Sequence, residues 1–325
     1  MSLLEVEGLR TVFATERGEV AAVDDVSFSL AAGEVLGIVG ESGSGKSVTA
    51  LSVMGLLPRP PARIAKGGIR FAGRDLLALN EAQMRRVRGP GIGMIFQEPM
   101  TSLNPVFTIG DQLIETIGAH ERLPQREKRE RAVAMLGKVG IAAASRRLDD
   151  YPHQLSGGMR QRVMIAMALA CNPKLLIADE PTTALDVTIQ AQILELLLNL
   201  RDELGMAVII ITHNMGVVAE TADRVLVMYA GKLVEEAPVD ALFGSPAHPY
   251  TRGLLDSIPS LDDERTRLHT IPGSLPNPAA LPQGCRFAPR CAFRIPQCEA
   301  ALPPLVNVGA GHEAACIRQA ELAMP

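Results

Sequence analysis

The sequence predicts an α/β fold built on a largely parallel sheet. Apolar runs of strand length recur along the chain, at 35–40, 91–96, 174–179, 207–212 and 224–229. Helical patterns follow such runs, as at 47–55 and 188–204. Continuous apolar strands that alternate with helices are typical of a parallel sheet covered on both faces. The first 30 residues instead alternate apolar and polar side chains, as in "AVDDVSFSL", which predicts antiparallel strands at an edge.

The remaining segments differ from this core in character. Residues 98 to about 172 lack strand-length apolar runs and are predicted to be helical, with an amphipathic candidate at 126–140. After residue 236 long periodic helices are absent, and 13 of the 23 prolines occur there. The sequence therefore predicts a domain over 1–235, which includes the helical subdomain, and a small irregular C-terminal domain over 236–325.

Composition limits the classes of protein that fit this chain. Its 325 residues are 47% hydrophobic, enough for a large core, and the formal net charge of −4 argues against a nucleic-acid partner. The N-terminal segment lacks a basic region followed by an apolar one, so no secretory signal is expected. The longest apolar runs, "AVIII" and "VMIAMALA", are far shorter than the roughly 20 residues of a membrane span. We expect a protein that is cytosolic or peripheral to a membrane.

Residues 40–47, "GESGSGKS", fit the G-x-x-x-x-G-K-[S/T] pattern of a phosphate-binding loop. The loop follows an apolar strand and precedes a helix, the context that makes the pattern informative. Its glycines let backbone N–H groups turn towards phosphate oxygens, and the helix start adds positive charge. We expect Lys46 to reach the β- and γ-phosphates and Ser47 to offer its hydroxyl to Mg²⁺. The predicted nucleotide-binding residues of this segment are Gly40, Glu41, Ser42, Gly43, Ser44, Gly45, Lys46, Ser47 and Val48. The alternative is a glycine-rich turn that binds no ligand.

A second stretch, "LLIADE" at 175–180, ends a buried strand with two carboxylates. Carboxylates in such a place are costly unless they meet a cation or a water molecule. Asp179 suits a contact to Mg²⁺ through water, and Glu180 suits the base that polarises an attacking water. A helix N-cap made of the same acidic pair is the alternative.

The stretch "LSGGMRQR" at 155–162 supplies a second helix start that favours anions, opened by Ser156 and the following glycines. An ordinary serine cap is the alternative. The stretch resembles the signature motif of ATP-binding cassette (ABC) ATPases, P-loop NTPases with a RecA-like core, an antiparallel β edge and a helical subdomain. In that family two cassettes pair head to tail, and each signature covers the ATP held by the other cassette. The resemblance implies this role for Leu155, Ser156, Gly157, Gly158 and Met159.

The resemblance extends over residues 1 to about 235, and no catalytic motif is degenerate. It implies that Gln97 in "IFQEP" contacts Mg²⁺ and water, and that Asp186 in "ALD" lies at the dimer seam. It implies that His213 in "IITHN" lies near the γ-phosphate and that Phe13, 33 residues before Lys46, stacks on adenine. A surface glutamine, a structural histidine and a buried strand phenylalanine are the alternatives. The implied catalytic set is Lys46, Gln97, Glu180 and His213, and the implied Mg²⁺ set is Ser47, Gln97 and Asp179.

The segments "SPAHPYTRGLLDSIP" at 245–259 and "GCRFAPRC" at 284–291 resemble the C-terminal extension of oligopeptide and dipeptide importer ATPases. The resemblance implies a bacterial importer subunit that hydrolyses ATP, peripheral to the cytoplasmic face of the inner membrane. Its implied partners are a second cassette, identical or homologous, two transmembrane permease subunits and, indirectly, an extracytoplasmic solute-binding protein. Nickel, glutathione and antimicrobial-peptide uptake systems share the tail and stay open as alternatives. Residues 98–113 are expected to contact a membrane subunit.

Two other classes of function are less compatible with the motifs. Soluble ABC proteins that act on ribosomes or nucleic acid usually carry two cassettes or a long coiled-coil insertion, whereas each motif occurs once here. A non-hydrolysing interaction module would not need both Glu180 and His213.

Four of the five cysteines are gathered in the tail, with spacing C-x5-C-x6-C-x17-C: Cys285, Cys291, Cys298 and Cys316. The spacing matches neither a C-x2-C zinc pair nor the cysteine pattern of a ferredoxin. Four cysteines nevertheless match the number of ligands that a zinc ion or a 4Fe-4S cluster needs. A proline-rich segment that buries little apolar surface is stabilised when its cysteines bind a metal group of this kind. Some importer ATPases with a similar tail hold a 4Fe-4S cluster, which is therefore the favoured interpretation, in a structural or redox-sensing role. Zinc and plain reduced thiols stay open, and Cys171 is expected to be a small buried apolar residue.

Overall fold

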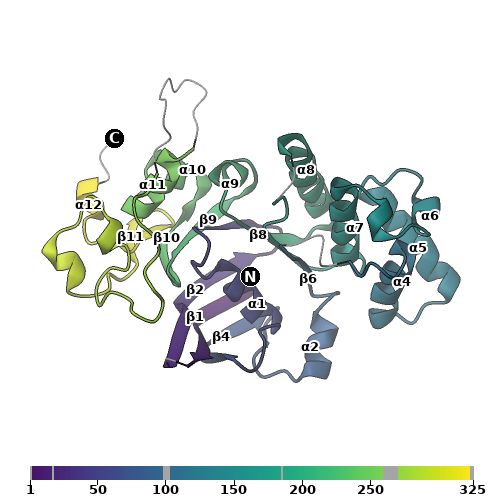
Figure 1. Ribbon diagram of the computed structural model, residues 1–325, viewed down its shortest axis with the longest axis horizontal. Helices are drawn as coiled ribbons and strands as arrows, with labels where there is room; N and C mark the ends of the chain where they lie inside the picture. Colours follow the sequence, from purple (N-terminus) through teal and green to yellow (C-terminus); the bar gives the residue numbers. More distant parts are fainter. Residues whose placement is uncertain (1, 17, 98–102, 184–185, 259–269, 323–325) are drawn as a thin grey trace. The chain divides into compact units, whose positions relative to one another are not determined.

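The computed structural model describes residues 2–16, 18–97, 103–183, 186–258 and 270–322 (Figure 1). Backbone contacts divide the chain into two compact units. The first unit comprises Met1–Ala31, Val35–Leu77 and Ile211–Pro325, and the second comprises Ala32–Glu34 and Ala78–Ile210. The boundary near residue 210 falls within strand β8 (Ala207–Thr212).

The first unit contains an antiparallel sheet with the strand order β2-β1-β4-β5. The bounds are β1 (Ser2–Thr15), β2 (Gly18–Ala31), β4 (Ala62–Phe71) and β5 (Arg74–Asp75). The antiparallel pairing of β1 with β2 confirms the prediction for the first 30 residues. Strand β4 was not predicted, because Lys66, Gly67 and Gly68 interrupt its apolar pattern. Gly67 has φ of 99°, and a Cβ there would lie 2.6 Å from the carbonyl oxygens of Glu7 and Gly8, so only glycine fits this crossing of β1.

The first unit also contains the buried strand β3 (Val35–Val39), which pairs in parallel with β9 (Arg224–Tyr229). Strand β10 (Lys232–Pro238) continues this sheet antiparallel to β9, followed by β12 (His312–Ala314) and β11 (Val306–Gly309). The pairing of β12 with β10 ties the C-terminal extension into the sheet that carries β3. This hairpin was not predicted from the sequence. Helices α1 (Lys46–Met54), α9 (Met215–Thr221), α10 (Val239–Gly244), α11 (Pro249–Asp256) and α12 (Gln319–Leu322) belong to the same unit.

A buried carboxylate anchors the extension to β10. Glu235 is fully buried and accepts hydrogen bonds from the backbone N–H groups of Ala247 at 2.6 Å and His248 at 2.9 Å. Its Oε1 also lies 2.8 Å from Nε2 of His312 on β12. Since buried polar groups need such partners, this network fixes the start of α11 and the hairpin on one strand. Short 3₁₀ helices at Ala288–Arg290 and Pro296–Glu299 shape the rest of the extension.

The second unit combines buried parallel strands with a group of helices. Strand β6 (Ile92–Ile95) pairs in parallel with β7 (Leu175–Asp179), and every residue of both strands is buried. The helices are α2 (Glu81–Val87), α4 (Ile109–His120), α5 (Gln125–Lys138), α6 (Ala144–Arg147), α7 (Gly157–Leu169) and α8 (Val187–Leu204), with a 3₁₀ turn at Pro152–Gln154. Figure 1 shows α4, α5, α6 and α7 gathered in one group. The segments described between 103 and 172 contain helices and turns and no strand, as predicted.

The α/β prediction is confirmed, since all five apolar runs form strands: β3, β6, β7, β8 and β9. The division at residue 235 stays a prediction, because the compact units follow contacts in space rather than the order of the chain. Among the described residues, no helix is both long and apolar enough to cross a bilayer.

Candidate functional site

The phosphate-binding loop lies in the first unit between β3 and α1. Gly40 and Gly45 have φ of 150° and 104°. A Cβ at Gly40 would lie 2.2 Å from the carbonyl oxygen of Met228, and one at Gly45 would lie 2.6 Å from that of Ala22. Backbone on both sides therefore excludes any larger residue at these positions. A Cβ at Gly43 would meet no atom of the described residues within 4 Å, so the outer side of the loop is open.

Lys46 begins α1 and is buried, with its ammonium folded over the loop. Its Nζ donates to the carbonyl oxygens of Gly40 at 2.7 Å and Glu41 at 3.0 Å. Gly45 caps the helix without a side chain, and the first turn carries no acidic residue. A helix start of this kind, with a lysine beside it, suits a bound anion. The loop thus fits the phosphates of a nucleotide, with Ser42 exposed, Ser44 buried, and Ser47 and Val48 half-buried.

Two more predicted residues lie in the first unit. Phe13 is half-buried on β1, where it pairs with Val20 of β2 and Ala62 of β4. His213 is exposed directly after β8. The next residue, Asn214, caps α9 by accepting a hydrogen bond from the N–H of Gly216 at 2.9 Å.

In the second unit, Glu180 and Gln97 lie together. Nε2 of Gln97 donates to Oε2 of Glu180 at 3.0 Å, and the hydroxyl of Thr183 donates to the same oxygen at 2.9 Å. Glu180 has φ of 48°, a left-handed conformation that is rare outside glycine and concentrates at functional sites. The buried Asp179 precedes it as the last residue of β7. The predicted base and the predicted Q-loop glutamine are therefore hydrogen-bonded to each other.

The signature segment starts α7 in the same unit. Ser156 is the N-cap, and its hydroxyl accepts a hydrogen bond from the N–H of Met159 at 3.3 Å. Leu155 is buried, Ser156 and Gly157 are exposed, and Gly158 and Met159 are half-buried. Ser156 therefore acts as an N-cap, which was the alternative interpretation of the sequence. The start of α7 is also exposed on the surface of this unit.

Other contacts of the second unit were not predicted from the sequence. The side-chain amide of Gln161 on α7 donates to the carbonyl oxygen of Pro181, next to Glu180. Asp186, the predicted D-loop residue, is exposed and caps α8 by accepting from the N–H of Ile189 at 2.9 Å. Gln161 thus joins the helix that the signature opens to the loop after β7.

The candidate membrane-contact segment 98–113 is described in part, since residues 98–102 lie outside the described residues. Just before α4, the side chains of Val106 and Phe107 are 70% and 51% exposed. Large apolar side chains that are exposed next to each other are a feature of interaction surfaces.

Sequence reasoning missed two residues of the extension that contact the phosphate-binding loop. The hydroxyl of Tyr250 accepts a hydrogen bond from the N–H of Glu41 at 2.8 Å, and Arg290 forms an ion pair with the Glu41 carboxylate. The only indication in the sequence was that both residues belong to motifs, "HPYT" and "CRFAPRC", that resemble the C-terminal extension of importer ATPases. That resemblance included no physical reason for a contact with the phosphate-binding loop.

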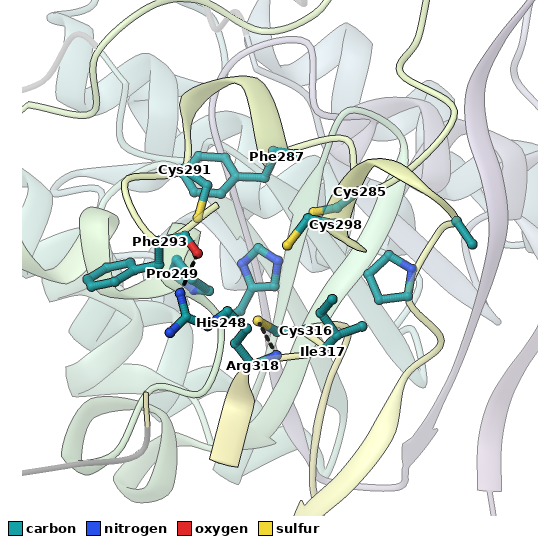
Figure 2. Close-up of a pocket in the computed structure, with 13 residues that line it drawn as sticks. His248, Pro249, Cys285, Phe287, Cys291, Phe293, Cys298, Cys316, Ile317 and Arg318 are labelled. Atoms are coloured by element: carbon teal, nitrogen blue, oxygen red, sulfur yellow. Dashed lines mark hydrogen bonds between the residues drawn. The ribbon is translucent and has the colours of Figure 1, made fainter. Parts of the chain in front are cut away.

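The four tail cysteines line a cavity of about 20 Å³, together with His248 and Phe287 (Figure 2). All five cysteines of the chain are free thiols, and Cys171 is buried in the second unit, as expected. Burial raises the pKa of Cys285 and Cys291, and raises that of Cys316 to about 11. Burial also lowers the pKa of His248 to about 4, so it is neutral near pH 7.

This cavity fits a metal group in one respect and not in another. The sulfur donors suit zinc or an iron–sulfur cluster in number and chemistry. The volume holds about one water molecule, less than a cluster needs. Within the described ranges, no three His, Cys, Asp or Glu side chains are placed to hold a metal ion. The arrangement is that of four free cysteines around a small cavity.

Comparison with known proteins places these features in a family. Residues 23–183 match the family described as ABC transporter, and residues 234–298 match the oligopeptide/dipeptide transporter C-terminal region. A protein of Brucella abortus strain 2308 is 56% identical over 332 aligned residues, covering 99% of this chain and 98% of its own. A protein of Brucella suis biovar 1 is 55% identical over 314 aligned residues, which cover 97% of this chain and 94% of the relative. Both carry the provisional name of a peptide import ATP-binding protein.

Solved structures support the same assignment. An ATP-binding cassette solved as a dimer in a post-hydrolysis state, bound to ADP and Pi, has a TM-score of 0.65 at 28% identity, covering 73% of this chain and 98% of its own. The cbiO1 protein of Clostridium perfringens, part of the ABC transporter complex cbiONQ, has a TM-score of 0.64 at 30% identity, covering 75% and 91%. The chain is therefore an ATPase subunit of the ABC transporter family, in the group that carries the oligopeptide/dipeptide transporter C-terminal region.

Proposed function

We propose that this protein hydrolyses ATP to energise the uptake of di- or oligopeptides across the cytoplasmic membrane of a bacterium. The observation that carries the proposal is the relation to the Brucella peptide import ATP-binding proteins over nearly the full length of both chains. The match of residues 234–298 to the oligopeptide/dipeptide region supports the same substrate class.

The residues of the two units support distinct roles in hydrolysis. Glu180 would polarise the attacking water, and its left-handed backbone and bond from Gln97 support a fixed orientation of its carboxylate. Lys46 and His213 would stabilise negative charge on the γ-phosphate. Ser47, Gln97 and Asp179 would hold Mg²⁺, which neutralises phosphate charge when bound. Phe13 would stack on the adenine.

The proposed transporter also contains a second cassette and membrane subunits. The exposed start of α7 at Ser156 supports a role for the signature on the nucleotide of a second, identical or homologous cassette. The exposed Val106 and Phe107 support a contact with one of two transmembrane permease subunits. We infer a peripheral location on the cytoplasmic face, with a solute-binding protein on the other side of the membrane.

Uptake by cells tests the substrate class. In cells that lack this chain, uptake of radiolabelled di- and oligopeptides should fall to background and return when the wild-type chain is supplied. Unlabelled peptides of varied sequence should compete, whereas Ni²⁺ and glutathione should not. Normal peptide uptake without the chain, with loss of nickel or glutathione uptake instead, would overturn the peptide assignment and favour a related uptake system.

We further propose that Cys285, Cys291, Cys298 and Cys316 bind a 4Fe-4S cluster with a structural or redox-sensing role. The support is that all four line the same cavity, none is in a disulfide, and sulfur is the donor such clusters use. The cavity would have to widen on loading, since it has room for about one water molecule.

Metal analysis tests the cluster. Anaerobic purification from cells competent in cluster assembly should give coloured protein with about four iron and four sulfide per chain. The double variant Cys291→Ser/Cys298→Ser should lose this iron, whereas the matched variant Cys171→Ala should keep it. Colourless wild-type protein without iron would refute the cluster, and stoichiometric zinc in that sample would establish the zinc alternative.

A further inference from the structure

Glu41, the second residue of the phosphate-binding loop, is held by an arginine far along the chain. Nη1 of Arg290 donates to Oε2 of Glu41 at 2.7 Å, and Nη2 donates to Oε1 at 3.0 Å. The Glu41 side chain is 28% exposed and that of Arg290 is 6% exposed. Parallel bonds of this kind fix the planes of both groups, and they are stronger than bonds between neutral groups.

Arg290 is itself held by the extension. Its Nε donates to the carbonyl oxygen of Pro272 at 2.8 Å, and its Nη2 donates to that of Ile271 at 3.2 Å. Its guanidinium carbon lies 5.8 Å from the ring centroid of Tyr229, within reach of a cation–π interaction. The arginine is therefore a rigid part of the extension, and Glu41 is attached to that rigid part.

Tyr250 holds the backbone of the same loop residue. It is fully buried, and its hydroxyl accepts the Glu41 N–H at 2.8 Å. Its ring lies 4.6 Å from that of Tyr229 and 5.4 Å from that of Phe287, measured between centroids. Packing in this aromatic group leaves the Tyr250 hydroxyl little freedom to follow a moving loop.

A negative charge at this position has a direct consequence for ATP. The carbonyl oxygens of Gly40 and Glu41 accept from Lys46, so Glu41 belongs to the loop segment that carries the phosphate-binding lysine. An unpaired carboxylate on a loop that binds a polyanion would oppose binding by repulsion. The guanidinium of Arg290 offsets that charge and fixes the loop at the same time.

We propose that Arg290 and Tyr250 are positioning residues for ATP binding, which act through Glu41 and make the phosphate-binding loop depend on the C-terminal extension. The inference rests on the proposed function only in that the chain binds ATP. Its readout is nucleotide affinity of the full chain, so loss of peptide transport with normal ATP affinity would count against the proposed function alone.

The first test removes the charge of Arg290. In Arg290→Gln, Glu41 keeps its charge without a partner, and we expect the Kd for Mg-ATP to rise about tenfold. In the assembled complex KM for ATP should rise similarly while kcat stays within about twofold, because the catalytic groups are untouched. The loss should shrink at high salt, since salt screens the repulsion. The matched control Arg294→Gln removes an exposed arginine of the same segment and should leave Kd unchanged.

Rescue separates positioning from general stability. Glu41→Gln removes the unpaired charge, so the double variant Glu41→Gln/Arg290→Gln should bind ATP nearly as well as Glu41→Gln alone. A merely structural role for Arg290 predicts a double variant at least as impaired as Arg290→Gln. Tyr250→Phe, which removes one hydroxyl and keeps the ring, should raise Kd about threefold.

The Kd values of these variants decide whether Arg290 and Tyr250 position the phosphate-binding loop. An unchanged Kd in Arg290→Gln, or a double variant without rescue, would overturn the proposal. If Arg290→Gln fails to fold, Tyr250→Phe decides the proposal in the same titration with a fluorescent ATP analogue. A normal Kd in Tyr250→Phe would then refute the positioning role.

Discussion

Glu180→Gln is expected to abolish ATP turnover in the assembled complex while nucleotide binding is retained. The amide keeps the size of the carboxylate and can still accept the bond from Gln97, so the fold around β7 should persist. An amide cannot take a proton from water, and loss of a general base costs about 10²–10⁴ in rate. The measurement is steady-state ATPase activity together with the Kd for Mg-ATP.

The matched control for this variant is Glu195→Gln, since Glu195 is exposed on α8 and belongs to none of the predicted motifs. That control should keep wild-type turnover. ATPase activity of Glu180→Gln within about tenfold of wild type would remove Glu180 from the role of base, since a base contributes more than that.

Ser156→Arg is expected to reduce ATPase activity of the complex to background. The N-cap of α7 is exposed, and an arginine there would place a long side chain where the second cassette's nucleotide is proposed to approach. The cap bond to Met159 would also be lost, at a cost of about 1 kcal/mol, which is too small to unfold the unit. ATP affinity of the isolated chain should stay within about twofold of wild type.

Ser145→Arg provides the control, since Ser145 is exposed on α6 in the same unit. It should leave both ATPase activity and affinity intact. If Ser156→Arg weakened ATP binding of the isolated chain as much as it lowered activity, the signature would act on its own chain's nucleotide, and the two-cassette site would be wrong.

The sequence predicted the parts of the fold that depend on residues close to one another in the chain. The strands β3, β6, β7, β8 and β9 are apolar apart from polar residues at the ends of β7, β8 and β9, so their burial could be predicted from the residues alone. Strand β4 was missed because glycines and a lysine break its pattern where it crosses β1. The hairpin β11–β12 was missed because short strands that add to an existing sheet draw their stability from the partner strand β10 rather than from their own composition.

The candidate site shows the same division. The phosphate-binding loop and the signature are contiguous motifs, so their residues could be named before the structure was known. Tyr250 and Arg290 meet Glu41 from 209 and 249 residues away, and no periodicity or spacing encodes such a contact. The motifs "HPYT" and "CRFAPRC" were recognisable only by resemblance. The structure gives them a physical role, because one supplies the tyrosine and the other the arginine that hold the loop.

Coupled transport in vesicles shows whether ATP hydrolysis by this chain energises peptide uptake. The complex that co-purifies with this chain from solubilised membranes should contain membrane subunits and, once reconstituted with its solute-binding protein, should accumulate labelled peptide in proteoliposomes when ATP is supplied. We expect peptide to stimulate ATP hydrolysis and Glu180→Gln to abolish accumulation and hydrolysis together. Peptide accumulation that continues at the wild-type rate with Glu180→Gln, or ATP hydrolysis with no peptide accumulation in the wild type, would contradict it.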